Sequence, residues 1–350
     1  MSASATVRVM SPEEIAARAG GETPFLRLPE RGTVFAERAM RLRQLARGHA
    51  MADYLDFVAD LAQAQQRLLD GLAAADGPAA PALPDAAALA RAARAGLPPL
   101  PAADGPDAAW RGLLRALLAE LQRSAPAATQ AVLQRLAGAD DAFLDRQADA
   151  LLGGHADGLD LAAAPLVGAA LQVLWTHQVC AVQARAAAHQ PSRGAPFGRT
   201  DDERACPCCG SRPTASITRS AGESLGQRYL HCSLCSTQWH LVRIKCSHCG
   251  SDKHLAYQSL EAADAEPAEG AGSRAAQAAV QAETCDDCGH YLKIVHSDRD
   301  PFVDPVADDL ASLTLDLLVA ETGQRRHGVN LMLLFGEGAA EPPPDTGPGG

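Results

Sequence analysis

Four C-x-x-C pairs constrain this chain more than any other feature of its sequence. Eight of its ten cysteines form them, and all lie between residues 206 and 288: Cys206/Cys209, Cys232/Cys235, Cys246/Cys249 and Cys285/Cys288. Two thiolates three positions apart on a tight turn bind one metal ion together, and two such turns complete a tetrahedral four-sulfur site. The four pairs therefore predict two metal sites.

The residues that follow these pairs favour metal binding over disulfides. Gly210, Gly250 and Gly289 each follow a pair directly, and glycine tolerates the positive φ that lets the backbone aim N–H groups at sulfur. The second pair is followed by Ser236 instead. Structural disulfides would require an oxidising compartment. The N-terminus has no basic region followed by an apolar core, so we expect no secretory signal, and a soluble cytoplasmic protein with reduced thiols.

The order of the pairs favours sequential pairing, with each site spanning a β-hairpin as in zinc ribbons and rubredoxin. The first site would use Cys206, Cys209, Cys232 and Cys235, and the second Cys246, Cys249, Cys285 and Cys288. An interleaved arrangement, first pair with third and second with fourth, stays open. Four thiolates leave no open coordination position, which argues against metal-centred hydrolysis. Sulfur ligands suit iron or zinc, and the sequence does not choose between the two metals.

Other thiols and imidazoles in the chain are expected to stay outside the metal sites. Cys208 competes with Cys209, but the spacing and Gly210 favour Cys209, so Cys208 is expected to point outward as a spare thiol. Cys180 has no partner at ligand spacing and is predicted to be a buried, inert thiol. Eight thiolates already satisfy two metals, so we expect supporting or surface roles for His231, His240, His248, His254 and His290.

The chain as a whole is predicted to be α+β, with an all-helical N-terminal domain over 1–198. Large apolar residues at three-to-four spacing predict the longest helices over 51–72, 107–121 and 161–189. Residues 73–106 are rich in Ala, Pro and Gly and read as a connection. The apolar stretch inside 161–189 is interrupted by glutamines and a histidine, so it is interpreted as a buried helix rather than a membrane span.

The C-terminal half is predicted to hold two four-cysteine ribbon modules and a final helix. The first ribbon covers 199–250 and the second 246–300, followed by a helix and apolar segment over 301–336 and a disordered tail over 337–350. The final helix is expected over 306–321, with Asp304 as its cap and Pro305 as its first residue. Residues 261–275 are interpreted as a surface loop.

Charge argues against nucleic acid as the partner. The formal net charge is −11, which disfavours binding to a polyanion. Lys and Arg do outnumber acids between Arg204 and Leu260, but a divalent metal with four thiolates carries a negative net charge that nearby arginines neutralise. A zinc-ribbon nucleic-acid-binding protein stays open as an alternative, as does a rubredoxin-like iron protein for electron transfer or redox sensing.

Three segments resemble the formate dehydrogenase accessory protein family over Cys206 to Leu318. They read CPCCGSRP, GQRYLHCSLCSTQWHLVRIKCSHCG and AETCDDCGHYLKIVHSDRDPFVDPVADDLASLTLDLL. The helical half agrees more loosely, in TPFLRLPERG and in the order of its helices. The resemblance implies rubredoxin-like sites with iron or zinc. It also implies a cytoplasmic assembly factor, not an enzyme, that contacts the catalytic subunit of a respiratory formate dehydrogenase before export and is needed for its maturation.

Five residues are candidates for contact with that partner. Trp239, His240 and Arg243 lie between the second and third cysteine pairs. They are predicted to form a short strand, on which Trp239 and Arg243 would share a face. An aromatic and an arginine on a rigid ribbon suit an interface, although Trp239 is equally well interpreted as core. The resemblance adds Asp308 and Asp309, whose alternative role is favourable charge near a helix N-terminus.

Overall fold

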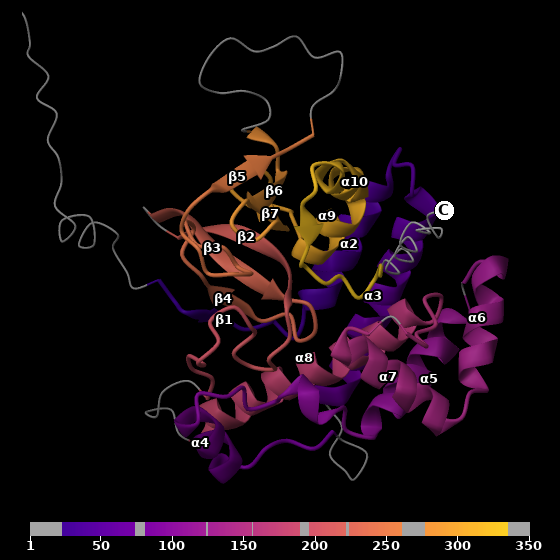
Figure 1. Cartoon of the computed structure of the whole chain (residues 1–350). Helices are drawn as coiled ribbons and strands as arrows, with labels where there is room; N and C mark the ends of the chain where they lie inside the picture. The colour runs from indigo at the N-terminus through magenta and orange to yellow at the C-terminus, as the bar shows by residue number, and fades with distance from the viewer. Residues whose placement is uncertain are drawn as a thin grey trace, which may run out of the picture.

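The computed structural model describes residues 23–73, 81–123, 125–155, 157–189, 196–221, 224–260 and 277–334. Within them, a helical body lies against one mixed β-sheet, with two short helices beside the sheet's far half (Figure 1). The helical body contains α2 (Val34–Ala46), α3 (Ala52–Ala73), α4 (Ala86–Arg94), α5 (Ala109–Leu121), α6 (Ala127–Ala137), α7 (Asp141–Gly153) and α8 (Ala164–His189). The predicted α+β class is confirmed.

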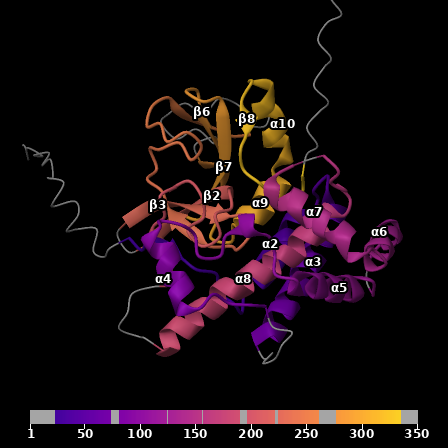
Figure 2. The same ribbon diagram turned by 60° about the horizontal axis from the view of Figure 1, so that its bottom comes forward.

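Helix α8 runs through the middle of the helical body, with α3, α5 and α7 packed on it (Figure 2). In the described part of the chain it is the one helix long and apolar enough to span a membrane, but 89% of its most apolar window is buried inside the protein. It is therefore a core helix, as its polar interruptions predicted. Asp85 and Asp140 cap α4 and α7 through their side chains, which helps to fix where those helices begin.

The sheet joins both cysteine-rich regions in one structure. Its strands follow the order β1-β4-β3-β2-β7-β6-β5, with β8 beside β7. The bounds are β1 (Leu26–Arg27), β2 (Pro213–Ala221), β3 (Ser224–Cys232), β4 (Gln238–His240), β5 (Leu255–Gln258), β6 (Val280–Cys285), β7 (His290–His296) and β8 (Arg325–Arg326). The hairpins β2–β3 and β6–β7 meet where β2 and β7 pair in parallel, Ile217 opposite Val295. The two predicted ribbons are thus halves of a single sheet.

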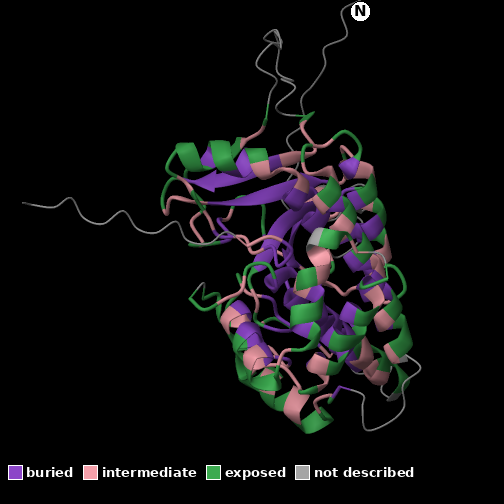
Figure 3. Cartoon of the chain, turned by 90° about the vertical axis from the view of Figure 1, so that its right-hand side faces the viewer, coloured by how far each residue is buried: buried purple, intermediate pink, exposed green. Residues whose placement is uncertain are grey.

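The boundary expected at residue 198 does not separate the core. One cluster of buried apolar residues extends from Phe35 and Trp110 in the helices to Cys209 and Trp239 in the first cysteine region. Strand β1 comes from the N-terminal region and pairs with β4, Leu26 opposite Trp239. Figure 3 shows buried residues along the sheet and on the inner sides of the helices. The first cysteine region therefore packs as part of the helical body.

The C-terminal helix differs from its prediction. It is two helices, α9 (Pro305–Ala311) and α10 (Leu313–Glu321), separated at Ser312. The amine of Lys293 donates to the carbonyls of Asp309 and Ser312, and the Ser312 hydroxyl donates to the carbonyl of Asp308. These donors take carbonyls that a continuous helix would use itself, so the helix breaks there. The predicted start is confirmed, because the Asp304 side chain accepts from the N–H groups of Val306 and Ala307.

Three further expectations meet different outcomes. The short strand expected to hold Trp239, His240 and Arg243 is β4, and it ends at His240. Arg243 lies beyond it, where the chain continues to the second cysteine region. Strands β1, β6 and β8 had no prediction. The loop expected over 261–275 and the tail over 337–350 lie outside the described residues.

Candidate metal centres

The first candidate metal centre is a buried group of four cysteines. The sulfurs of Cys206, Cys209, Cys232 and Cys235 lie within 4.8 Å of one another, and all four residues are buried. The distance between sulfurs is 3.5 Å for Cys206 and Cys235, and 3.4 Å for Cys209 and Cys232. The group combines the first and second pairs, so the sequential pairing is the one the structure adopts.

The second candidate centre has the same composition but is more open to solvent. Cys246, Cys249, Cys285 and Cys288 again lie within 4.8 Å of one another. The sulfur distance is 3.8 Å both between Cys246 and Cys288 and between Cys249 and Cys285. Cys249 is exposed and Cys288 half-buried, whereas the other two are buried. The two centres therefore differ in accessibility rather than in ligand chemistry.

Both groups fit a tetrahedral metal ion better than disulfides. A metal–sulfur distance of about 2.3 Å places the corners of a tetrahedron about 3.8 Å apart, close to the sulfur spacings above. A disulfide would bring two sulfurs to about 2.05 Å, and all eight cysteines are free thiols. Burial raises the pKa of Cys206 and Cys232 well above that of an ordinary thiol. A bound cation would supply the charge that lets buried thiolates form, so each group could hold one metal ion.

The turns at the four pairs have the predicted backbone geometry. Gly210, Gly250 and Gly289 have φ values of 77°, 80° and 65°. At the corresponding place in the second pair, Ser236 adopts φ 58° although it carries a side chain. The N–H groups of Leu234 and Cys235 both donate to the Cys232 sulfur at 3.4 Å. The turn at Ser236 therefore has the same positive φ as the three glycine turns.

Cys208 lies inside the protein, contrary to the expectation that it points outward. It is fully buried beside the first group, where the Thr237 hydroxyl donates to its sulfur at 3.6 Å. It is not part of the four-sulfur group. The residue is held inward because this turn packs on the helical body: the N–H of Leu100 donates to the Cys208 carbonyl.

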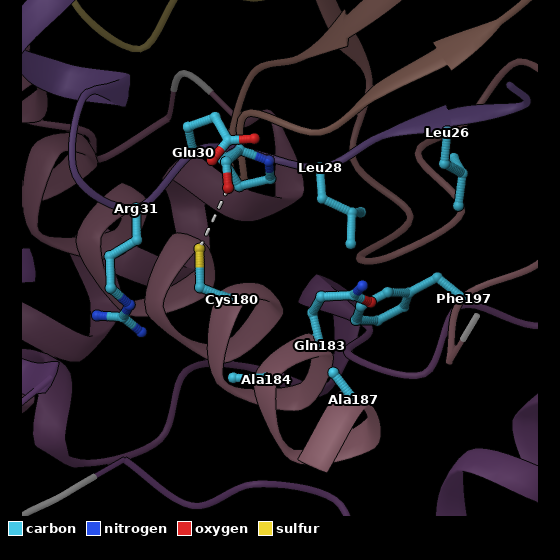
Figure 4. A pocket seen from close by; sticks show the side chains of 10 residues that line it. Leu26, Leu28, Glu30, Arg31, Cys180, Gln183, Ala184, Ala187 and Phe197 are labelled. Atoms are coloured by element: carbon cyan, nitrogen blue, oxygen red, sulfur yellow. Dashed lines mark hydrogen bonds between the residues drawn. The ribbon is translucent and has the colours of Figure 1, made fainter. Parts of the chain in front are cut away.

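Cys180 lies outside both four-sulfur groups, as its spacing predicted, but it is half-buried rather than buried. Its sulfur contacts the Pro29 carbonyl at 3.5 Å, and burial raises its pKa to about 11. It lines a cavity of about 560 Å³ together with Leu26, Leu28 and Phe197 (Figure 4). Such a high pKa keeps the thiol protonated and unreactive at neutral pH.

A cluster of imidazoles borders the second group. The rings of His248 and His290 stack with centroids 3.9 Å apart, and His327 lies 5.3 Å from His248. The Ser247 hydroxyl and the His327 Nε2 are 2.8 Å apart. Sequence reasoning named His248 and His290 but missed His327, since it comes from the C-terminal segment and nothing in its local sequence ties it to a cysteine pair.

The five expected partner contacts separate into buried and accessible residues. Trp239 is fully buried and its ring N–H donates to the Glu203 carbonyl, so it is a core residue. Asp308 and Asp309 are each 2% exposed. In this structure none of these three side chains can reach a partner. His240 is half-buried and Arg243 is exposed, so they are the two of the five that can do so.

The two aspartates instead bind inside the protein. Asp308 accepts from Arg41 at 2.6 Å, and Asp309 accepts from Arg326 at 2.7 Å. Lys293 lies 3.4 Å from Asp309 and 2.5 Å from Asp316. Burial by itself would raise the pKa of Asp309, but Arg326 and Lys293 outweigh it and hold that pKa below its usual value. These contacts attach α9 to its neighbours.

Models of one protein family match the chain from residue 23 to residue 333 with short gaps. Family models described as FdhE N-terminal, FdhE central domain and FdhE C-terminal domain match residues 23–192, 205–243 and 244–333. The chain belongs to the FdhE family. This confirms the resemblance to the formate dehydrogenase accessory protein family seen in the cysteine-rich segments.

Full-length relatives support the assignment. A protein FdhE homolog of Pseudomonas aeruginosa is 43% identical over 330 residues, covering 94% of this chain and 98% of the relative. One from Edwardsiella ictaluri is 39% identical over 340 residues, covering 95% and 100%. The crystal structure of the FdhE protein from Pseudomonas aeruginosa matches with a TM-score of 0.73 and 41% identity, covering 89% of this chain and 99% of that one.

Proposed function

We propose that this FdhE-family protein is a cytoplasmic assembly factor. It binds the catalytic subunit of a respiratory formate dehydrogenase and is needed for maturation of that enzyme before export, without catalysing a reaction itself. The observation that carries the proposal is family membership along nearly the whole chain, in combination with two cysteine groups of the closed, four-sulfur kind.

The chemistry of the two centres supports a structural or regulatory role. Four thiolates around one ion leave no place for a substrate to coordinate. The first group joins the loop before β2 to the turn between β3 and β4, and the second joins the loop after β4 to the β6–β7 hairpin. Each ion, iron or zinc, would thus hold two loops of the sheet in a fixed arrangement, which suits a docking platform.

The accessible residues near the second centre are our proposed contact region. Arg243 lies with its guanidinium 5.8 Å from the Tyr257 ring centroid. Val242, Ile244 and Tyr257 are exposed apolar side chains, with Ile244 at 70%. An arginine among exposed apolar and aromatic side chains is typical of a protein interface. We therefore place the partner contact at 242–257 rather than at Trp239 or the two aspartates.

The proposal is tested by capturing the protein from cells. Affinity-tagged full chain, purified gently, should co-purify the formate dehydrogenase catalytic subunit, and metal analysis of the same sample should give about two iron or zinc ions per chain. Arg243→Glu with Ile244→Asp should lose the subunit while keeping its metal. Arg123→Glu, an exposed change on the far helical side, is the matched control and should retain it. Failure to recover the subunit with the wild-type chain would contradict the proposal.

Electron transfer or redox sensing is the second candidate, because Cys249 is exposed and Cys288 half-buried. A solvent-accessible four-sulfur iron site exchanges electrons readily and is open to oxidants. The two functions differ in whether the protein would stay active with zinc in place of iron. An electron-transfer protein needs iron in the second site, whereas an assembly factor stays active with zinc in both.

A further inference from the structure

A cavity of about 590 Å³ lies between α2, the first half of the sheet and the loop before α9. Its lining includes Arg27 of β1, Arg219 of β2, His231 of β3 and Gln238 of β4. The chain segment after β1 separates it from the cavity beside Cys180, because Leu28, Pro29 and Glu30 line both (Figure 4). A volume of this size is typical of small-molecule sites.

Three buried hydrogen-bond donors have no partner in the described part of the chain, two on residues that line this cavity and one on a residue behind them. They are the Nε of Arg27, the Nη1 of Arg38 and the Nε2 of His231. Arg38 is fully buried and His231 is 3% exposed. Arg38 lies behind two lining residues, 3.4 Å from the Ser236 hydroxyl and 3.4 Å from the Asp304 carboxylate. A buried donor without a partner costs free energy. A ligand that brings a hydrogen-bond acceptor into the cavity is therefore favoured.

Gln238 makes the free nitrogen of His231 a donor. Its Oε1 accepts from the Nε of Arg219 at 3.3 Å, and arginine is always a donor. The amide Nε2 of Gln238 must therefore be the group facing the His231 Nδ1 at 3.5 Å. Since that Nδ1 accepts, the proton of the neutral ring is on Nε2. The two lining residues, Arg27 and His231, then each present a donor without an acceptor, and no donor is required of the ligand.

The charges at the cavity favour an anion. Arg27 and Arg219 form no ion pair among the described residues; Arg27 stacks over the Tyr229 ring instead. Burial lowers the pKa of Arg219 and the neighbouring Arg27 lowers it further, and together they outweigh Asp304 and Glu37, which act to raise it. Of the acidic lining residues, Asp304 already caps α9 and binds Arg38. Glu30 and Glu37 line the cavity but are exposed, so water screens them more than the half-buried Arg27 and Arg219.

We propose that this cavity binds the phosphate group of a small molecule, through Arg27, Arg219 and His231, with Arg38 behind them. A tetrahedral oxyanion accepts from several directions at once, as donors from β1, β2 and β3 require, whereas a carboxylate is planar. His231 and Ser236 directly adjoin ligands of the first cysteine group, so a bound phosphate would lie beside that metal centre. The site goes beyond the proposed function and does not depend on it.

Calorimetric titration of the full, metal-loaded chain tests the proposal, with inorganic phosphate, AMP and acetate as probes at constant ionic strength. Phosphate or AMP should bind saturably and acetate more weakly. AMP tighter than phosphate indicates an ester as ligand; equal affinities indicate the free anion; both support the site. Arg219→Gln and, independently, Arg27→Gln should each weaken binding about tenfold or more. Glu37→Gln should tighten it, because it removes a negative charge from the cavity.

Arg43→Gln is the matched control, since it removes a positive charge from α2 at an exposed ion pair with Asp60. It should leave phosphate binding unchanged. Each variant is checked for melting temperature and metal content, and Arg27→Gln at the sheet edge serves if Arg219→Gln does not fold. Three results would overturn the proposal: no saturable binding of phosphate or AMP by the wild-type chain, acetate binding as tightly as phosphate, or equal weakening by Arg43→Gln.

Discussion

Arg41 of α2 and Asp308 of α9 form a bidentate ion pair, although 267 positions separate them in the chain. The Nη2 of Arg41 lies 2.6 Å from one carboxylate oxygen and its Nε lies 3.0 Å from the other. Asp308 also accepts from the N–H of Asp304 at 2.8 Å. The first helix of the helical body is thereby attached to the helix that follows the sheet, so an acidic residue that looked like a partner contact holds two ends of the fold together.

Asp308→Asn should therefore lower the free energy of unfolding by about 2 kcal/mol, because it removes the bidentate acceptor of a largely buried guanidinium and leaves it only the pair with Asp300. Asp60→Asn breaks the exposed ion pair between Asp60 of α3 and Arg43 of α2. It should lower the free energy of unfolding by less than about 1 kcal/mol. Chemical denaturation of both variants gives the comparison. Equal costs would mean that the Arg41 pair contributes no more than a surface contact.

Asp309 predicts a specific acid dependence of stability. Its pKa is held below the usual value in the folded protein, so its ion pairs stabilise the fold above the unfolded pKa of about 3.9 and are lost as pH falls below it. The difference in unfolding free energy between wild type and Asp309→Asn should shrink as pH drops from 6 towards 3. Denaturation curves across that range measure it, and a constant difference would contradict the assignment.

The first cysteine turn offers a matched pair of substitutions. Cys209→Ala should reduce bound metal by about one ion per chain and lower the melting temperature, because it removes one of four buried ligands. Cys208→Ala next to it should keep full metal content, since that sulfur lies outside the group. Metal analysis of the two purified variants shows which of the two cysteines is a ligand. Loss of metal from the Cys208 variant would exchange the roles of the two residues.

Accessibility predicts that the two centres lose metal at different rates. A chelator should remove the ion from the second group first, because Cys249 is exposed, while the first group stays loaded. The double change Cys232→Ser with Cys235→Ser should destabilise the whole chain, whereas Cys249→Ser should affect mainly the β5–β7 region. Timed metal release with hydrogen exchange distinguishes them, and simultaneous release would refute the difference.

Local sequence patterns predicted most of the two metal centres but less of the β-sheet. The three-position spacing predicted all eight sulfurs, because each pair lies on one local turn, and the order of the pairs predicted their sequential combination. The parallel pairing of β2 with β7 could not be predicted, since it depends on Ile217 and Val295 meeting across a long sequence separation. The burial of Cys208 and of Trp239 likewise depends on the helical body packed against them.

Formate dehydrogenase activity in cells that lack this protein tests the central claim most directly. With other maturation factors intact and no second copy of the gene, activity should fall strongly. Wild-type chain should restore it, while the chain carrying Cys232→Ser and Cys235→Ser should not. Activity that stays undiminished without the protein would contradict its assignment as an assembly factor.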